Sequence, residues 1–575
     1  MSLLHVLTFA PVVLGLLIAA MGRGRAFTVA LIGSLVHLAL TAYTLWSFDW
    51  SKPGAMQLEG GLPWIQALGI TLNVGVDSVA MLLIALTSLL GPICVLASKT
   101  AIVDRQRTFY AWLTVLSGAM VGVFAARDII FFYICFEFTL IPMFFLIHLF
   151  GSINRTYAAI KFFLYTFTGS IITLAGLVYV AYQHTLTSGS WTFDIAALEM
   201  TARSLPATSQ AWVLLALMLG FAVKVPLFPF HTWLPLAHTE APTAGSVILA
   251  GVLLKLGTYG LYRFALPFTP AAVLEFAPLI AGVCVVGIIY GGLICWVQTD
   301  VKKLVAYSSV AHLGFCVLGL IALNQTGVTG SILYMINHGL STGALFLLIG
   351  FMYERYHTRS MREVGGLAAK MPIWATFMVF FTMASVGLPG LNGFISEFLC
   401  LMGAFQASSA WGSAGLAEGA KGAWGSTGLI AGATPGQMGP WLAAIAGTGM
   451  IIAAIYLLYM LGKVVFGPLK EPAGHDAHHA GGHHDDKAHG EHHGALPADL
   501  TAREITALVP LAVLCIALGV YPKPVTDALR EPVAQTVKAV QDARPLVPRT
   551  APAKTTETAT GGASQNQISV TEAAR

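Results

Sequence analysis

The chain has 575 residues, of which 56% are hydrophobic and only 10% are charged, whereas a soluble protein of this length carries about 25% charged residues. This composition excludes a soluble globular protein and indicates a polytopic membrane protein. The net charge of +4 gives no support for nucleic-acid binding, and the seven cysteines show no CxxC or Cys/His spacing that would support a disulfide framework or an iron–sulfur centre.

Fourteen apolar segments approach the length of about 20 residues that a membrane-spanning helix requires. They cover residues 4–21, 27–47, 76–98, 108–126, 129–150, 157–182, 210–226, 243–264, 273–297, 303–324, 328–352, 372–403, 440–467 and 504–521. The first has no basic region before it, so we expect a transmembrane helix rather than a cleaved signal peptide. The sequence therefore predicts an all-α polytopic membrane protein with about fourteen transmembrane helices.

Basic residues are unevenly distributed between the two alternating sets of loops. The set that begins with residues 22–26 holds sixteen lysines and arginines, whereas the opposite set before the C-terminal tail holds five. Because lysine and arginine are enriched in cytoplasmic loops, we predict that the first set is cytoplasmic and that both termini lie outside.

Two loops and the tail have unusual compositions. Residues 404–440 are rich in Gly, Ala and Ser, and we expect a flexible loop there. Residues 474–494 contain eight histidines; such tracts can bind metal, but a solvated low-complexity loop is the favoured interpretation. In the tail, residues 525–540 fit a short amphipathic helix on the membrane surface, and we expect disorder beyond Arg544.

Two lysines lie in apolar segments, at Lys224 and Lys255. A lysine at the centre of a membrane-spanning helix costs roughly 2.5–3.5 kcal/mol on insertion scales, and such residues mark proton or ion paths. A proline-rich stretch, KVPLFPFHTWLP, interrupts the helix that carries Lys224, and a break at membrane depth is tolerated only where protein or water satisfies the backbone. We therefore predict a buried, hydrated, titratable site. The alternative is that both lysines snorkel from helix ends.

Two carboxylates and two histidines complete the candidate site. Glu137 lies in the apolar stretch DIIFFYICFEFTLIP, and Lys224 is its natural cationic partner, as a switchable pair or as a static buried ion pair. His312 and His338 lie on consecutive predicted helices. Each alone fits a hydrogen-bonded core residue, but the two together favour a proton relay. Glu397 follows a Pro/Gly break, LPGLNG, in the twelfth segment.

The two interrupted segments are the seventh and the twelfth. Corresponding broken helices in two halves are typical of inverted-repeat transporters, and a separation of five crossings gives the two copies opposite orientations. We predict two inverted five-helix repeats, each with a discontinuous helix, related by a pseudo-two-fold axis in the membrane plane. The predicted organisation is N-terminal helices (1–107), a first repeat (108–264), a second repeat (273–467), a His-rich cytoplasmic loop (468–503), a last helix (504–522) and a polar tail (523–575).

Several motifs together resemble the antiporter-like subunit M family of NADH:quinone oxidoreductase, respiratory complex I, called subunit 4 in mitochondria. The motifs are FEFTLIPMFFLI, KFFLYTFTGS, KVPLFPFHTWLPLAHTEAPTAGSVILAGVLLKLGTYGLYRF, QTDVKKLVAYSSVAHLGF and LPGLNGFISEF, within residues 76–466, with a weaker match at 499–522. The resemblance implies that Glu137 and Lys224 form the input pair, that Lys255 and His312 relay protons, and that Glu397 is the output residue.

The resemblance also implies a bacterial inner-membrane subunit that contacts the antiporter-like subunits L and N and lipid. It would act as a proton translocase without redox chemistry of its own, so NADH, FMN, iron–sulfur clusters and quinone would belong to other subunits. A subunit of a multi-subunit Na⁺/H⁺ antiporter is the alternative in the same class, and a passive membrane scaffold is the alternative outside it. One residue departs from the family pattern HTWLPDAH, because Leu236 stands where the family has aspartate.

Overall fold

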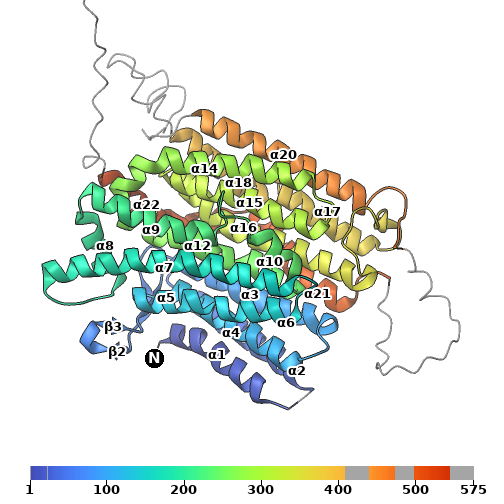
Figure 1. Cartoon of the computed structure of the whole chain (residues 1–575), viewed down its shortest axis with the longest axis horizontal. Helices are drawn as coiled ribbons and strands as arrows, with labels where there is room; N and C mark the ends of the chain where they lie inside the picture. Colours follow the sequence, from blue (N-terminus) through green and yellow to red (C-terminus); the bar gives the residue numbers. More distant parts are fainter. Residues whose placement is uncertain (1, 23, 408–439, 473–497, 544–575) are drawn as a thin grey trace, which may run out of the picture.

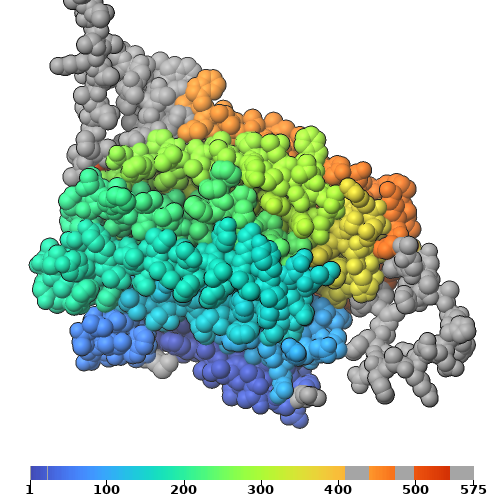
Figure 2. Space-filling view, viewed as in Figure 1, coloured from blue at the N-terminus to red at the C-terminus, as the bar shows by residue number. Residues whose placement is uncertain are grey.

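The computed structural model describes residues 2–22, 24–407, 440–472 and 498–543, and most of the regular structure in them is helical. The long helices lie side by side in an elongated bundle, with the N-terminal helices at one edge and α20 (Pro440–Val464) at the other (Figure 1). The space-filling view of the same face shows closely packed helices (Figure 2). The expectations for the Gly-rich loop between 408 and 439, for the histidine tract and for the tail beyond Arg544 lie outside the described residues.

The predicted fold class is confirmed. In the described part of the chain, thirteen helical segments are long and apolar enough to cross a membrane, and they coincide with thirteen of the fourteen predicted segments. The fourteenth, residues 372–403, is divided between two shorter helices, α17 (Pro372–Val386) and α18 (Asn392–Gln406). The limits of the repeats and the axis between them stay predictions.

The N-terminal part consists of three helices and two small β-ribbons. The elements are α1 (Leu3–Ala20), α2 (Ala26–Ser47), β1 (Gln57–Gly60), β2 (Pro63–Ile65), η1 (Gln66–Leu68), β3 (Ile70–Thr71), β4 (Val74–Val76) and α3 (Ser78–Ala101). The strand β1 pairs with β4, and β2 pairs with β3, both antiparallel. The sequence pattern did not predict these strands, because each has at most four residues.

The first predicted repeat, together with the short helix that follows it, is built from helices of very different length. They are α4 (Gln106–Ala125), α5 (Ile129–Phe138), α6 (Leu140–Phe150), α7 (Arg155–Ser188), α8 (Ile195–Ser204), α9 (Ala207–Lys224), α10 (Leu234–Glu240), α11 (Thr243–Ile248), α12 (Leu254–Gly260) and α13 (Leu266–Phe268). The single segment predicted at 129–150 is divided at Thr139 into α5 and α6. Proline at position 142 explains the division, because its ring clashes with the carbonyl of Phe138 and its nitrogen carries no proton.

The helix that carries Lys224 is discontinuous, as predicted. Helix α9 ends at Lys224, the chain turns through the proline-rich stretch, and α10 begins at Leu234. The segment around Lys255 differs from the plain helix that its hydropathy predicts. Two π-helical turns, η2 (Leu249–Leu253) and η3 (Leu261–Ala265), flank α12, and π turns inside helices occur frequently at functional sites.

The second predicted repeat contains the longest buried helices. Its further elements are α14 (Pro270–Trp296), α15 (Val301–Ile321), α16 (Gln325–Tyr356) and η4 (Leu367–Ala369). The second discontinuity is also confirmed, since α17 ends before Gly387 and α18 begins after Leu391. Gly387 and Gly390 have φ values of 83° and 94°, a left-handed conformation that glycine adopts without steric cost.

The chain ends, within the described residues, in one more spanning helix, α21 (Ala502–Val520), and in α22 (Lys523–Asp542). Helix α22 is the predicted amphipathic helix, and its apolar face packs against α14, α16 and α13. Ser78 Oγ donates a hydrogen bond of 2.7 Å to the carbonyl of Ala528. The helix therefore covers one end of the bundle; its position relative to the membrane surface stays a prediction.

Candidate functional site

Lys255 and His338 form a direct contact in the interior of the bundle. The Lys255 side chain has no exposed surface, and its Nζ lies 2.8 Å from His338 Nδ1. The same ammonium donates a hydrogen bond to the carbonyl of Ala250, five residues earlier in η2. When Lys255 is protonated it can only donate, so His338 Nδ1 then accepts; when the amine is neutral, a protonated His338 Nδ1 donates instead. A proton can pass along this hydrogen bond from amine to imidazole.

His338 leads to the second histidine. The rings of His338 and His312 lie with their centroids 5.9 Å apart and an angle of 65° between their planes. Both side chains are buried, and His338 Nε2 has no hydrogen-bond partner among the described residues. The predicted relay on consecutive helices is therefore present as a geometric arrangement of two imidazoles, although its role is a proposal.

Glu397 is held at the end of this series by contacts with a tyrosine and a histidine. Tyr334 OH donates to Glu397 Oε1 at 2.6 Å, and His312 Nδ1 lies 3.1 Å from the same oxygen. Tyr334 OH also lies 2.6 Å from His312 Nδ1, and Tyr456 OH lies 3.4 Å from His312 Nε2. Only 2% of the Glu397 surface is exposed, and both contacts go to Oε1, since Oε2 has no hydrogen-bond partner among the described residues.

A small cavity lies between the two histidines and Glu397. Its volume is about 10 Å³, and its lining includes Asn337 and Ser341 as well as the three titratable groups. That volume is close to the minimum for a single water molecule, and the lining is polar enough to bind one. The site therefore offers room for one bridging water where the two imidazoles do not touch.

The second helix break places Glu397. A Cβ atom at Gly387 would lie only 2.7 Å from Glu397 Oε2, so a side chain at the end of α17 would press on the carboxylate. Glycine at this position meets two requirements, the left-handed backbone and the close approach of the carboxyl group. The Pro/Gly signal that marked the break in the sequence thus also shapes the pocket of the acid.

Lys224 and Glu137 lie at some distance from this series. Lys224 Nζ donates a 3.3 Å hydrogen bond to Thr139 Oγ1 and lies 4.8 Å from the centre of the Phe136 ring. Glu137 is half-buried and accepts hydrogen bonds from Ser170 and, at 3.4 Å, from Tyr133. Among the described ion pairs none joins Glu137 to Lys224, so a closed pair is not the arrangement seen here.

The structure thus brings together four of the six predicted site residues, Lys255, His338, His312 and Glu397, in one buried series. Sequence reasoning missed the two tyrosines that contact His312. A signal for Tyr334 was present, because it lies four residues before His338 and shares its helix face. Tyr456 has no comparable local signal. No group of three or more His, Cys, Asp or Glu side chains that could hold a metal ion occurs in the described ranges.

Comparisons with known proteins show which family this chain resembles. The family described as NADH:quinone oxidoreductase/Mrp antiporter, TM, matches residues 126–418. NADH-quinone oxidoreductase subunit M from Rhodobacter capsulatus is 38% identical over 549 residues, which are 93% of this chain and 96% of that protein. The subunit M of Pseudomonas aeruginosa is 40% identical over 471 residues, 81% and 82% of the two chains.

The chain belongs to the NADH-quinone oxidoreductase subunit M family. A chain of respiratory complex I from Thermus thermophilus superimposes with a TM-score of 0.77 and 27% identity, over 93% of this chain and 99% of that one. A chain of the Mrp complex from Dietzia sp. superimposes with a TM-score of 0.72 and 21% identity, over 94% and 100% of the two chains. At that identity the Mrp likeness shows the shared fold alone. The relatives at 38% and 40% identity confirm the resemblance to subunit M that the motifs indicated.

Proposed function

We propose that this chain is a proton-translocating membrane-arm subunit of an NADH:quinone oxidoreductase, which moves protons along the buried series of titratable groups. The observation that carries the proposal is the series Lys255–His338–His312–Glu397, in which each group lies within one hydrogen bond or one water molecule of the next. Ionisable residues inside a membrane protein are costly, and proton relays are among their principal uses. Membership of the subunit M family supports the same assignment.

In the proposed cycle, Lys224 takes the role of a switch. When Glu137 is close, its negative charge favours the protonated lysine, and separation favours release of the proton toward Lys255. The lone hydroxyl and ring contacts of Lys224 are weak enough to be exchanged during such a cycle. The proton then passes from Lys255 through the histidines to Glu397, which releases it on the outer side.

Redox chemistry would take place in other subunits, where NADH, FMN, the iron–sulfur clusters and quinone would bind. The energy would reach this chain as changes in hydration and electrostatics along the membrane arm. We expect the antiporter-like subunits L and N and lipid as its neighbours, in the inner membrane of a bacterium. The Na⁺/H⁺ antiporter alternative rests on the shared fold and on the family model that covers both classes, whereas the relatives of 35–40% identity are complex I subunits.

The test uses the assembled complex in inside-out membrane vesicles. Lys255→Ala should reduce NADH-driven proton uptake and quinone reduction together, because a blocked proton path stalls the redox cycle. Lys52→Ala, at an exposed lysine in the loop before β1, is the control and should leave both rates unchanged. Normal proton uptake by an assembled Lys255→Ala complex would contradict the proposal, and loss of assembly alone would favour a scaffold.

A further inference from the structure

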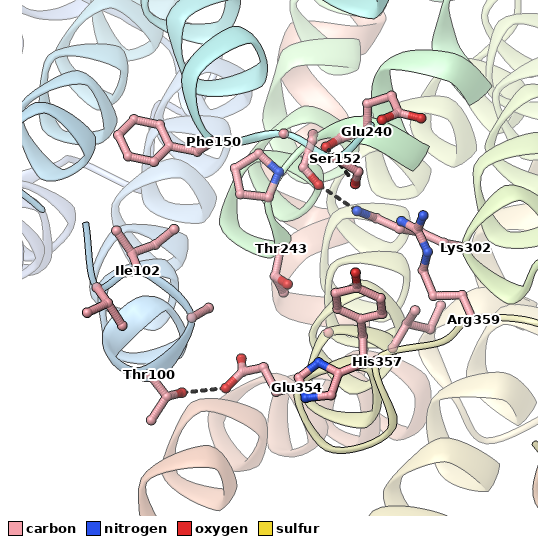
Figure 3. Close-up of a pocket in the computed structure, with 18 of the residues that line it drawn as sticks. Thr100, Ile102, Phe150, Ser152, Glu240, Thr243, Lys302, Glu354, His357 and Arg359 are labelled. Atoms are coloured by element: carbon pink, nitrogen blue, oxygen red, sulfur yellow. Dashed lines mark hydrogen bonds between the residues drawn. The ribbon is translucent and has the colours of Figure 1, made fainter. Parts of the chain in front are cut away.

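A large cavity opens at the end of the bundle where α3, α6, α10, α15 and α16 meet (Figure 3). Its volume is about 710 Å³, and its charged lining residues are Lys99, Glu240, Lys302, Glu354, His357 and Arg359. Figure 3 shows Lys302 and Arg359 on one side and Glu354 with Thr100 on the other. The loops around it, at 98–107, 150–155, 298–302 and 355–362, belong to the basic set that the sequence predicts to be cytoplasmic.

Lys302 lies in the wall of this cavity. Only 7% of its surface is exposed. Its Nζ donates to the carbonyl of Ala241 at 2.6 Å and, at 3.4 Å, to that of Thr239. Lys302 forms no ion pair with any described carboxylate within 4 Å. The side chain is therefore a buried amine with neutral partners, placed between the cavity and the second half of the broken helix.

The next titratable group inward is His238, which precedes Thr239 in α10. His238 has no exposed surface, its ring stacks on Phe346 at 4.5 Å, and neither ring nitrogen has a hydrogen-bond partner among the described residues. The imidazole lies within electrostatic range of both Lys302 and Lys255. A buried imidazole with two unused nitrogens, within electrostatic range of two lysines, is a suitable proton carrier.

We propose that this cavity is the uptake vestibule for cytoplasmic protons and that Lys302 is the first buried group to bind them, passing each proton through His238 to Lys255. The inference rests on the proposed function and adds an uptake route to it. In each step one N–H bond breaks and another forms, and the positive charge moves with the proton. No further reactant is required.

The charged groups that face Lys302 are consistent with an exchangeable proton. Glu240 on α10 and Asp300 before α15 are the nearest acids, and Arg359 lies beside them. His357, Glu354 and Lys99 face the same cavity from α16 and α3. Acidic and basic groups are both present around Lys302. No single strong partner therefore stabilises either its protonated or its neutral form.

A purely structural role for Lys302 is the competing explanation. Lys302 and Arg359 both donate to carbonyls at the end of α10, since Arg359 Nη1 lies 2.6 Å from the Thr239 carbonyl oxygen. Cations at a helix C-terminus stabilise it. Lys302→Arg separates the two explanations, because arginine retains the positive charge and the donors but does not release a proton.

The experiment compares Lys302→Arg with Lys303→Arg, the adjacent and exposed lysine, in assembled complexes in inside-out vesicles. Proton uptake and quinone reduction should fall by at least about tenfold in Lys302→Arg, because a proton-transfer group is lost, and remain unchanged in Lys303→Arg. Normal uptake in Lys302→Arg would overturn the inference. If Lys255→Ala is then still defective, the proposed function stands; if Lys255→Ala is also normal, both fail.

Access to the cavity supplies a second measurement that does not depend on variants of Lys302. The seven native cysteines are all buried, so a cysteine introduced at Val103, an exposed residue of the cavity wall, is a selective target. A membrane-impermeant, positively charged thiol reagent should slow proton uptake in inside-out vesicles of Val103→Cys, and should not do so in Lys303→Cys. Labelling of Val103→Cys only from the opposite side, or without effect on uptake, would overturn the vestibule.

Discussion

The two broken helices hold groups of opposite charge in different surroundings. Lys224 is the last residue of α9, where the negative end of the helix dipole favours a cation. Glu397 is the sixth residue of α18, beyond the first turn in which the helix dipole acts, so its surroundings are set by Tyr334 and His312 instead. The first break therefore presents the helix end that suits its charge, whereas the opposite orientation of the seventh and twelfth crossings stays a prediction.

The difference between the two breaks lies in how tightly the charged group is held. Lys224 has one hydroxyl contact and one aromatic face. Glu397 shares one carboxylate oxygen with Tyr334 and His312, and Gly387 leaves just enough room for the other. A weakly held cation can change partners at little cost, whereas a firmly held carboxylate gives a fixed end point. The comparison therefore assigns switching to the first break and terminal transfer to the second.

The largest effect is expected at the second break. Glu397→Gln keeps the size and one hydrogen-bond acceptor but removes the titratable group, so proton uptake with NADH should fall by at least about tenfold. Quinone reduction should fall with it. Glu397→Asp is the matched control and should retain much of the activity, because it keeps a carboxyl group. Equal activity of the Gln and Asp variants in assembled complexes would show that Glu397 is not the terminal proton-transfer group.

A second large effect is expected at the first break. Lys224→Ala and Glu137→Gln should each depress proton uptake and quinone reduction together, because each removes one member of the proposed switch. Assembly is measured separately by native electrophoresis of the solubilised complex. Normal pumping in either assembled variant would show that the pair is not the working switch. Switching could then no longer be assigned to the first break.

The sequence was sufficient for the membrane segments and for both breaks, because hydropathy, proline and glycine act over short distances along the chain. It was also sufficient for the candidate residues, since a lysine or carboxylate in an apolar segment is visible without a structure. It missed the division at Thr139 although Pro142 supplied the signal. The π turns beside Lys255 have no comparable signature in the residues.

Contacts between distant segments could not be read from the chain. Tyr456 approaches His312 across 144 residues, and Lys302 reaches α10 across about 60. The switch pair was predicted to be in contact; the structure places Glu137 within electrostatic range of Lys224 but gives the ammonium a hydroxyl partner, Thr139, between α5 and α6. Which polar groups meet in a membrane interior depends on helix packing, which the hydrophobic pattern leaves undetermined.

Tyr334→Phe should have an intermediate effect. It tests how much the tyrosine hydroxyl contributes to holding Glu397. The change removes one hydroxyl that donates to Glu397 and leaves the ring in place. A hydrogen bond to a charged group contributes about 1.5–3 kcal/mol, but His312 keeps its contact with the same oxygen. Only part of that stabilisation is therefore lost, and proton uptake should fall several-fold. The measurement is the rate of uptake in inside-out vesicles, compared with Tyr43→Phe, an exposed tyrosine of α2. A loss as large as that of Glu397→Gln would mean that the tyrosine itself carries the proton.

Thr139→Val should have the smallest effect and tests the weak hold on Lys224. Valine keeps the branched shape and removes the hydroxyl that accepts from the ammonium at 3.3 Å and donates to the Phe136 carbonyl at 2.7 Å. A hydrogen bond to a charged group contributes about 1.5–3 kcal/mol, but this one is long at 3.3 Å and the ammonium retains the Phe136 ring. Proton uptake should therefore fall by no more than a few-fold, and less than in Tyr334→Phe. If Thr139→Val is the more damaging of the two, Lys224 is the firmly held group, and the assignment of switching and terminal transfer to the two breaks must be reversed.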